Sequence, residues 1–104
     1  MGIDVAWVDE KHQPIQEVFD SSFLISRLAT SRWPKLSGSV CLRFIDPCGD
    51  AIFNQAQIPE LLQELRDEMS QPLDPRVRAQ LEKVVRLVER SPGRTHTYIM
   101  FIGD

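Results

Sequence analysis

The chain has 104 residues, of which 42% are hydrophobic and 26% are charged, and these proportions are typical of one globular domain spanning residues 1–104. It contains no low-complexity tract and no run approaching the roughly 18 apolar residues of a membrane span, which argues against a disordered, fibrous or membrane protein. The formal charge of -3 argues against a nucleic-acid partner, because proteins that bind phosphates usually carry a net basic surface.

The first third of the chain predicts a strand followed by a short helix. Residues 3–8 alternate with the period of two that is typical of a strand, and the polar residues 9–14 then favour a loop. The Asp-Ser-Ser sequence at 20–22 offers side chains that cap a helix, and the apolar residues after it predict a short helix ending near residue 30. Residues 31–39 are expected to form a connecting loop.

Residues 40–54 have the clearest local pattern, which predicts a β-hairpin. Apolar residues recur at every second position over 40–45, as in a strand. The sequence Asp-Pro-Cys-Gly at 46–49 has the residues that a type I turn prefers. Gly49 is expected to take the left-handed conformation before the return strand, residues 50–54.

Two helices and a last strand complete the predicted fold. Apolar residues recur with helical spacing over 58–69 and again over 75–90, where Asp74 can cap the helix and Pro75 suits its first turn. Residues 95–102 are rich in β-branched and aromatic residues and predict a strand, central in the sheet or beside the first strand. The order of elements predicts an α+β fold, a four-stranded antiparallel or mixed sheet with two long helices and one short helix packed on one face.

The sequence contains none of the common catalytic or cofactor-binding motifs, so no cofactor is expected. The histidines His12 and His96 and the cysteines Cys41 and Cys48 lack the spacing of metal ligands, and no metal site is expected. A cysteine in a strand and one at the tip of the following turn are too far apart for a disulfide. Together with the lack of a signal sequence, this predicts a cytoplasmic protein.

The alternation in the two predicted strands points to a surface on the side of the sheet away from the helices. It brings Arg43, His96, Tyr98 and Met100 together, so that titratable and apolar side chains are mixed. Such a face is typical of a protein interface or a ligand-binding platform. The alternative is that the N-terminal segment or the loop 31–39 covers it.

A catalytic reading of the same surface uses His96 as a base beside Arg43 and Tyr98, which predicts a small enzyme or a ligand-binding protein.

Two weaker binding candidates lie elsewhere in the chain. Trp33 is either a lid over the edge of the core or an exposed anchor for a partner. Arg86 and Arg90 belong to a basic row on the second long helix, which forms either a solvated face or a groove for an acidic partner.

Residues 41–54, CLRFIDPCGDAIFN, resemble a hairpin of the form R-F-I-D-P-x-G-D-x-x-F-N that a group of small uncharacterised bacterial proteins shares. Those proteins also have a pair of helices and a terminal strand ending in Gly-Asp. The resemblance implies a bacterial single-domain protein and carries no activity. By size and class, the chain is also similar to immunity proteins that neutralise toxins.

The sequence therefore predicts a non-enzymatic interaction module that binds another protein or a second copy of itself, as in a homodimer. Neutralising a toxin is one concrete form of that function.

Overall fold

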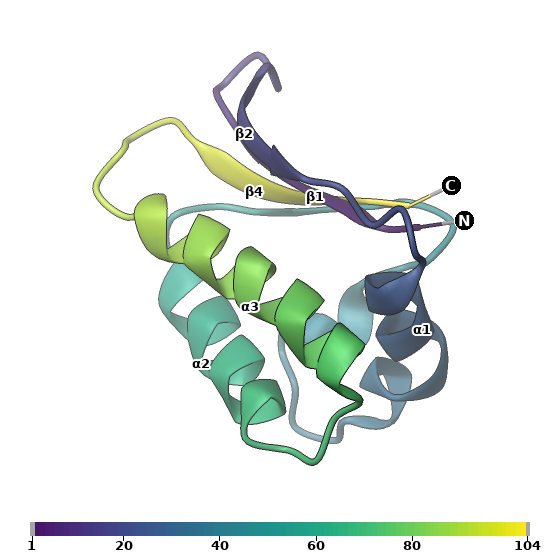
Figure 1. Cartoon of the computed structure of the whole chain (residues 1–104). Coiled ribbons are helices and arrows are strands. Elements are labelled where there is room, and N and C mark those ends of the chain that lie inside the picture. The colour runs from purple at the N-terminus through teal and green to yellow at the C-terminus, as the bar shows by residue number, and fades with distance from the viewer. Residues whose placement is uncertain (1, 104) are drawn as a thin grey trace.

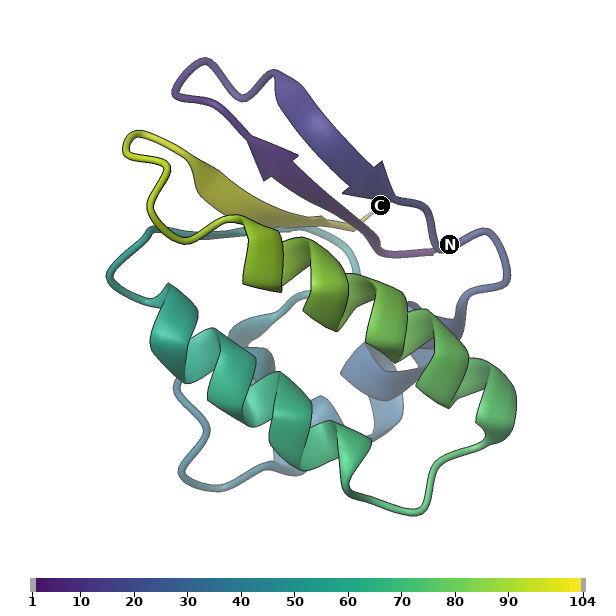
Figure 2. The same ribbon diagram turned by 60° about the vertical axis from the view of Figure 1, so that its left-hand side comes forward.

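The computed structural model describes residues 2–103, which form a four-stranded sheet with helices packed on one of its faces (Figure 1). Figure 2 shows the two layers from the side, with the long helices α2 and α3 next to each other beneath the sheet. The elements are β1 (Asp4–Val8), β2 (Pro14–Val18), α1 (Leu24–Ser31), the 3-10 helices η1 (Trp33–Lys35) and η2 (Leu42–Phe44), β3 (Asp50–Phe53), α2 (Ile58–Met69), α3 (Pro75–Arg90) and β4 (Tyr98–Ile102). The predicted α+β class, with two long helices and one short one, is confirmed.

The strands lie in the order β2-β1-β4-β3, and all neighbours are antiparallel. The last strand of the chain is thus central, and it lies beside the first strand, in agreement with both predicted places. Its pairing with β3 on the other side was not predicted. In the register, Val5 pairs with Phe101 and Trp7 with Ile99. These four side chains are buried in the main core, on the face that the helices cover.

The helices begin and end where local sequence signals predict. Asp74 caps α3, since its carboxylate accepts a hydrogen bond of 2.8 Å from the Arg76 amide, and Pro75 occupies the first turn. Asp20 is buried and accepts hydrogen bonds from the amides of Leu24, Ile25 and Ser26 in the first turn of α1, and of Ile3 next to β1.

The prediction of a strand at residues 40–45 was wrong, because this segment turns as η2. Val40 and Phe44, which alternation directed toward the helices, are 53% and 61% exposed, whereas Cys41 and Ile45 are buried. The amides of Val40, Cys41 and Leu42 all donate to the carboxylate of Glu64, on α2. Backbone donors that bind one side chain cannot also form a sheet ladder.

The turn at 46–49 forms, but it does not join two paired strands. The Gly49 amide donates to the Asp46 carbonyl at 3.3 Å, and the Asp46 carboxylate accepts from the Cys48 amide, both of which are typical of a turn that begins with Asp. Gly49 is not among the residues with positive φ, so the left-handed conformation expected there was wrong. The return strand β3 pairs with β4 instead of with residues 40–45.

The fourth strand is β2, in a segment where the sequence gives no clear strand signal. Four of its five residues are exposed and Val18 is partly buried, so no alternation of apolar and polar residues marks it. Pro14 is its first residue, a position that an edge strand tolerates.

Candidate functional site

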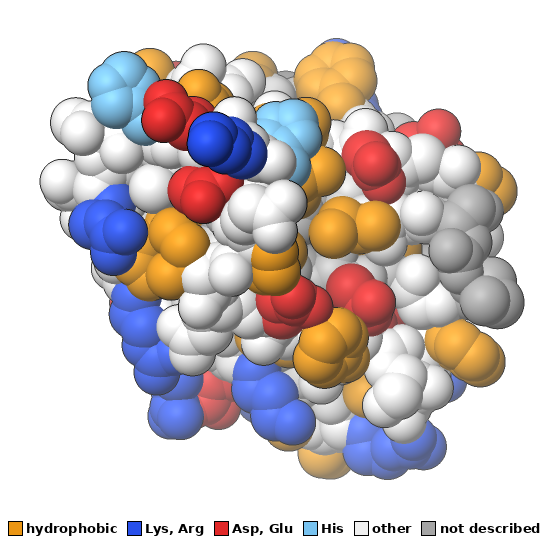
Figure 3. Space-filling model, turned by 90° about the horizontal axis from the view of Figure 1, so that it is seen from above, with side chains coloured by type: hydrophobic (Ala, Val, Ile, Leu, Met, Phe, Trp, Pro, Cys, Tyr) orange, Lys and Arg blue, Asp and Glu red, His pale blue; other side chains and the backbone are white. Residues whose placement is uncertain are grey.

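The outer face of the sheet carries a small apolar cluster that neighbouring side chains largely cover. Tyr98 and Met100 both lie on this face, and Met100 pairs with Ala6 of β1 and Ile52 of β3. Met100 is only 8% exposed, and it forms a buried cluster with Ala6 and Val8 against which Tyr98 packs. In Figure 3, acidic and basic side chains interrupt the apolar ones on this face. Few apolar atoms are therefore open to a partner at its centre.

His96 lies at one end of this face, in the turn before β4, and not within a strand as predicted. It is exposed and has a φ of 59°, in the left-handed region. With Tyr98, Thr97 and Gln55 it lines a shallow hollow of about 260 Å³. The Tyr98 ring also meets the His12 ring edge-on, with 6.3 Å between the ring centres.

Arg43 does not join these residues. It lies in η2, which packs against η1 and α2, and its guanidinium lies 4.7 Å from the centre of the Phe44 ring. The predicted set of Arg43, His96 and Tyr98 was wrong, because η2 lies on the helical side of the sheet. The enzyme alternative thereby loses Arg43, whereas His96 and Tyr98 still line one hollow.

Trp33 is a lid over the core and not an exposed anchor. It is fully buried, and its indole Nε1 donates a 2.9 Å hydrogen bond to Oε1 of Glu68. Its ring meets the Phe101 ring edge-on, with 6.4 Å between the ring centres. Glu68 also forms a bidentate ion pair with Arg32, at 2.7 and 3.1 Å.

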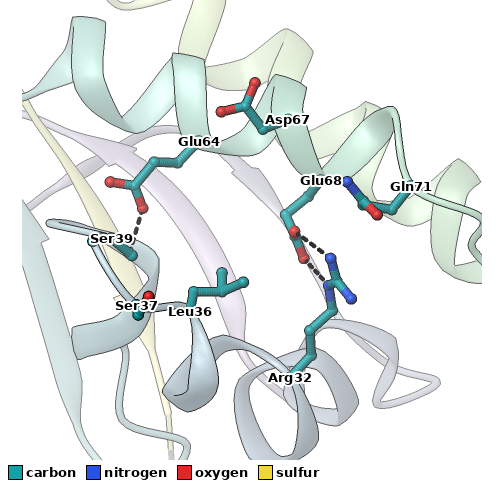
Figure 4. A pocket seen from close by; sticks show the side chains of 9 residues that line it. Arg32, Leu36, Ser37, Ser39, Glu64, Asp67, Glu68 and Gln71 are labelled. Carbon is teal, nitrogen blue, oxygen red and sulfur yellow. Dashed lines mark hydrogen bonds and ion pairs between the residues drawn. The ribbon is translucent and has the colours of Figure 1, made fainter.

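A pocket of about 330 Å³ lies between α2 and the segment that contains η1 and η2 (Figure 4). Figure 4 shows that Glu64 and Glu68 reach from α2 to Ser39 and Arg32, respectively, on the opposite wall. Burial raises the pKa of Glu64, but hydrogen bonds from the Ser39 hydroxyl and from three backbone amides outweigh it, so the pKa is lowered. Both carboxylates are fully engaged in bonds within the chain, which makes them structural.

Cys41 lies beside this wall, and its thiol is protected. Burial raises the pKa of Cys41 to about 11, and the negative charges of Glu64 and Glu60 add to the shift. Cys41 and Cys48 are both free thiols, and Cys48 is exposed. In the described part of the chain, no three His, Cys, Asp or Glu side chains gather in a group that could hold a metal ion.

The sequence contains a signal for the buried glutamate that the prediction missed. Glu68 follows Leu61 and Leu65 at i+7 and i+3, so it lies on the apolar stripe of α2, whose other members are buried. A carboxylate on such a stripe either accepts hydrogen bonds from a buried donor or destabilises the folded state. Here it is the partner of Trp33.

A groove of about 430 Å³ separates β2 from α3. One wall consists of β2 and the residue after it, Phe19, and the other consists of Lys83, Arg86 and Arg90. All three cations are exposed. Of the three, only Arg86 forms an ion pair with a residue in the described range 2–103, at 2.5 Å from Glu82. The predicted basic row thus lies next to a strand that the sequence did not predict.

Strand β2 is an edge of the sheet. Within residues 2–103 it pairs only with β1, so every second residue along it directs its N–H and C=O groups away from the sheet. Phe19, where the strand ends, is 64% exposed, and it also borders a second hollow of about 320 Å³ that contains Phe23 and Ile102. Phe23 is an exposed aromatic residue held at a φ of 58°, a conformation that bulky residues rarely adopt.

Comparison with known proteins gives no match to this chain among family models, curated proteins or solved structures. Within residues 2–103, no helix is both long and apolar enough to cross a membrane. The similarity of residues 41–54 to small bacterial proteins stays a prediction.

Proposed function

We propose that this chain is a non-enzymatic interaction module of the bacterial cytoplasm, which binds an extended segment of another protein along the free edge of β2. The observation that carries the proposal is an exposed edge strand with a groove beside it. Its two free thiols are in keeping with a reducing compartment. Neutralising a toxin is one form of this function and stays a prediction.

Strand addition suits the chemistry of this edge. An added strand pairs its backbone with the outward N–H and C=O groups, and its alternate side chains lie on the two faces of the sheet. Residues 15–18 all retain their N–H groups, because the single proline of the strand is its first residue. The register is irregular at Ile15, which lies between the residues paired with Trp7 and Val8, so the regular part of this edge consists of residues 16–18.

Charge favours a different protein over a second copy of the chain. If β2 paired with β2 of another copy, the two rows of Lys83, Arg86 and Arg90 would approach each other across the new pair. Like charges brought together at an interface oppose association. We therefore assign the edge to another polypeptide and not to a homodimer.

The test uses synthetic peptides of about eight residues, a length that covers the strand, in which Val alternates with Glu, Gln or Lys. Amide NMR spectra of the labelled chain are followed during titration, and light scattering gives its mass without peptide. We expect a monomer, and with at least one peptide we expect shifts confined to β2 and α3, with slower hydrogen exchange at alternate β2 amides.

The control is on the peptide, so that the fold is left intact. N-methylation of alternate residues removes the donors from one side of the peptide, and methylation of the other alternate set removes them from the opposite side. The peptide methylated on the side that pairs with β2 should not bind, and the peptide methylated on the opposite side should bind as the parent does. The proposal fails if no peptide shifts β2, if both methylated sets bind as the parent does, or if the free chain is a dimer with its β2 amides already protected.

A further inference from the structure

The row of cations beside the edge strand indicates what kind of segment would bind. Resting on the proposed function, we infer that the added strand is acidic, with Asp or Glu at alternate positions facing Lys83, Arg86 and Arg90. This names the chemical class of the partner.

The geometry of α3 sets the cations along the groove. Figure 2 shows α3 running beneath β1 and β2 in roughly the opposite direction to β2. The side chain of Gln80 donates a 2.8 Å hydrogen bond to the carbonyl of Phe19, which holds this part of α3 against the end of β2. Lys83 is therefore nearest the Phe19 end of the groove, and Arg90 is nearest the start of the strand.

The spacing of the row matches the spacing of an extended peptide. Lys83, Arg86 and Arg90 share one face of α3, and at about 1.5 Å per residue they span about 10 Å along its axis. Side chains on one face of a strand repeat about every 6.7 Å. Two or three alternate side chains of an added strand would thus face the three cations.

The positive charge of the groove wall favours an acidic segment, although the net charge of the whole chain is negative. The chain carries a formal charge of -3, yet the α3 wall of this groove presents three cations. An acidic segment is attracted to this wall although the molecule as a whole repels it. Such a contact controls where the segment binds, and it weakens as salt screens it.

Phe19 gives the segment an apolar end. Phe19 lies where β2 ends, and it borders both the basic groove and the hollow next to Phe23. An exposed aromatic residue at the end of a charged groove is a suitable anchor, because aromatic contacts supply much of the energy of small interfaces. We expect an apolar residue of the segment next to its acidic positions.

The experiment compares the Glu, Gln and Lys peptides by fluorescence anisotropy with the intact chain. We expect the Glu peptide to bind about tenfold more tightly than the Gln peptide, because each of three exposed ion pairs contributes about twofold. The Lys peptide should bind more weakly than both. This preference should shrink when NaCl is raised from about 50 mM to about 500 mM.

Matched charge reversals test the assignment to α3. The triple variant Lys83→Glu, Arg86→Glu and Arg90→Glu should prefer the Lys peptide. The control triple variant carries the same change of charge outside the groove, at the exposed residues Arg27, Lys35 and Arg76, each replaced by Glu, and it should still prefer the Glu peptide. A Glu peptide that ends in Leu should bind the wild-type chain more tightly than one that ends in Ser. Replacing Phe19 by Ser should remove this difference in affinity.

The outcomes separate this inference from the proposed function. Equal binding of the three peptides, or an unchanged preference in the groove variant, overturns the acidic partner and leaves strand addition standing. Failure of all three peptides to bind overturns both.

Discussion

At the scale of single residues, buried and partly buried carboxylates hold the irregular segments of the chain in place. Asp20 joins the amide of Ile3 to the first turn of α1, and Glu64 binds three successive amides before η2. Glu68 binds Trp33 and Arg32 in the same way. Asp20 and Glu68 thereby satisfy amide and indole donors that would otherwise be buried without a partner.

Glu64→Gln should destabilise the protein by about 2 kcal/mol at neutral pH, because several hydrogen bonds lose their charged acceptor and the new amide group cannot accept at both ends. The folded state lowers the pKa of Glu64, so its contribution is complete above the pKa of the unfolded chain and is lost as pH falls through the folded pKa. Urea denaturation at about pH 7 and about pH 3 should therefore show the gap between wild type and variant narrowing on acidification.

Glu60→Gln is the matched control for this prediction, since Glu60 is exposed one turn earlier on α2. It should change the free energy of unfolding by no more than about 0.5 kcal/mol. A gap for Glu64→Gln that stays constant with pH would show that its carboxylate is not the group that holds residues 40–42.

At the scale of elements, two segments with the same alternation behave differently. Residues 98–102 form the strand β4 inside the sheet, whereas residues 40–45 contain the 3-10 helix η2 and no strand, although both segments have apolar residues at every second position. Phe101 packs edge-on against Trp33 and Phe53, with ring centres 6.4 and 5.8 Å away. Phe44 is exposed. Position in the tertiary structure, and not local pattern, separates the two.

Phe101→Ala should lower the free energy of unfolding by about 4 kcal/mol, because it empties a buried site between two aromatic rings. Phe44→Ala should change it by less than about 1 kcal/mol, since little apolar surface is lost from the core. Urea denaturation of both variants measures the difference. Comparable losses in the two would mean that Phe44 is buried and that residues 40–45 form a strand after all.

At the scale of the whole molecule, the sheet depends on contacts between the two ends of the chain. β1 and β4 are the central pair, and in the described part of the chain β3 pairs with no strand except β4. The last strand is also the source of Ile99 and Phe101 in the main core. Without β4, the sheet would lose the pairing of both β1 and β3, and the core would lose the side chains of Ile99 and Phe101.

A chain that ends at Thr97 should therefore not fold. We expect circular dichroism to show loss of the sheet and of a cooperative thermal transition, because a core of this size is only marginally stable. A chain that ends at Ile102 keeps all of β4 and should unfold cooperatively. A folded chain ending at Thr97 would show that β1 and the helices suffice without the central strand.

Most helices could be predicted from the sequence, and so could the first and last strands. The stripes of α2 and α3 repeat with helical spacing, and Asp74 and Pro75 mark a start that depends only on neighbouring residues. The basic row on α3 could be predicted for the same reason. The groove could not, because its second wall is β2, an exposed edge strand that has no alternating pattern to recognise.

The sequence by itself determined the fold class and the long helices, since spacing and capping act within a few residues of the chain. Only the tertiary structure decided that residues 40–42 bind Glu64 instead of pairing with β3, and that β2 forms the edge of the sheet beside β1. Glu64 is more than 20 residues away from the amides it binds. A hydrogen bond between such distant positions produces no periodic pattern in the sequence. It nevertheless occupies the same backbone N–H groups that a sheet ladder would need.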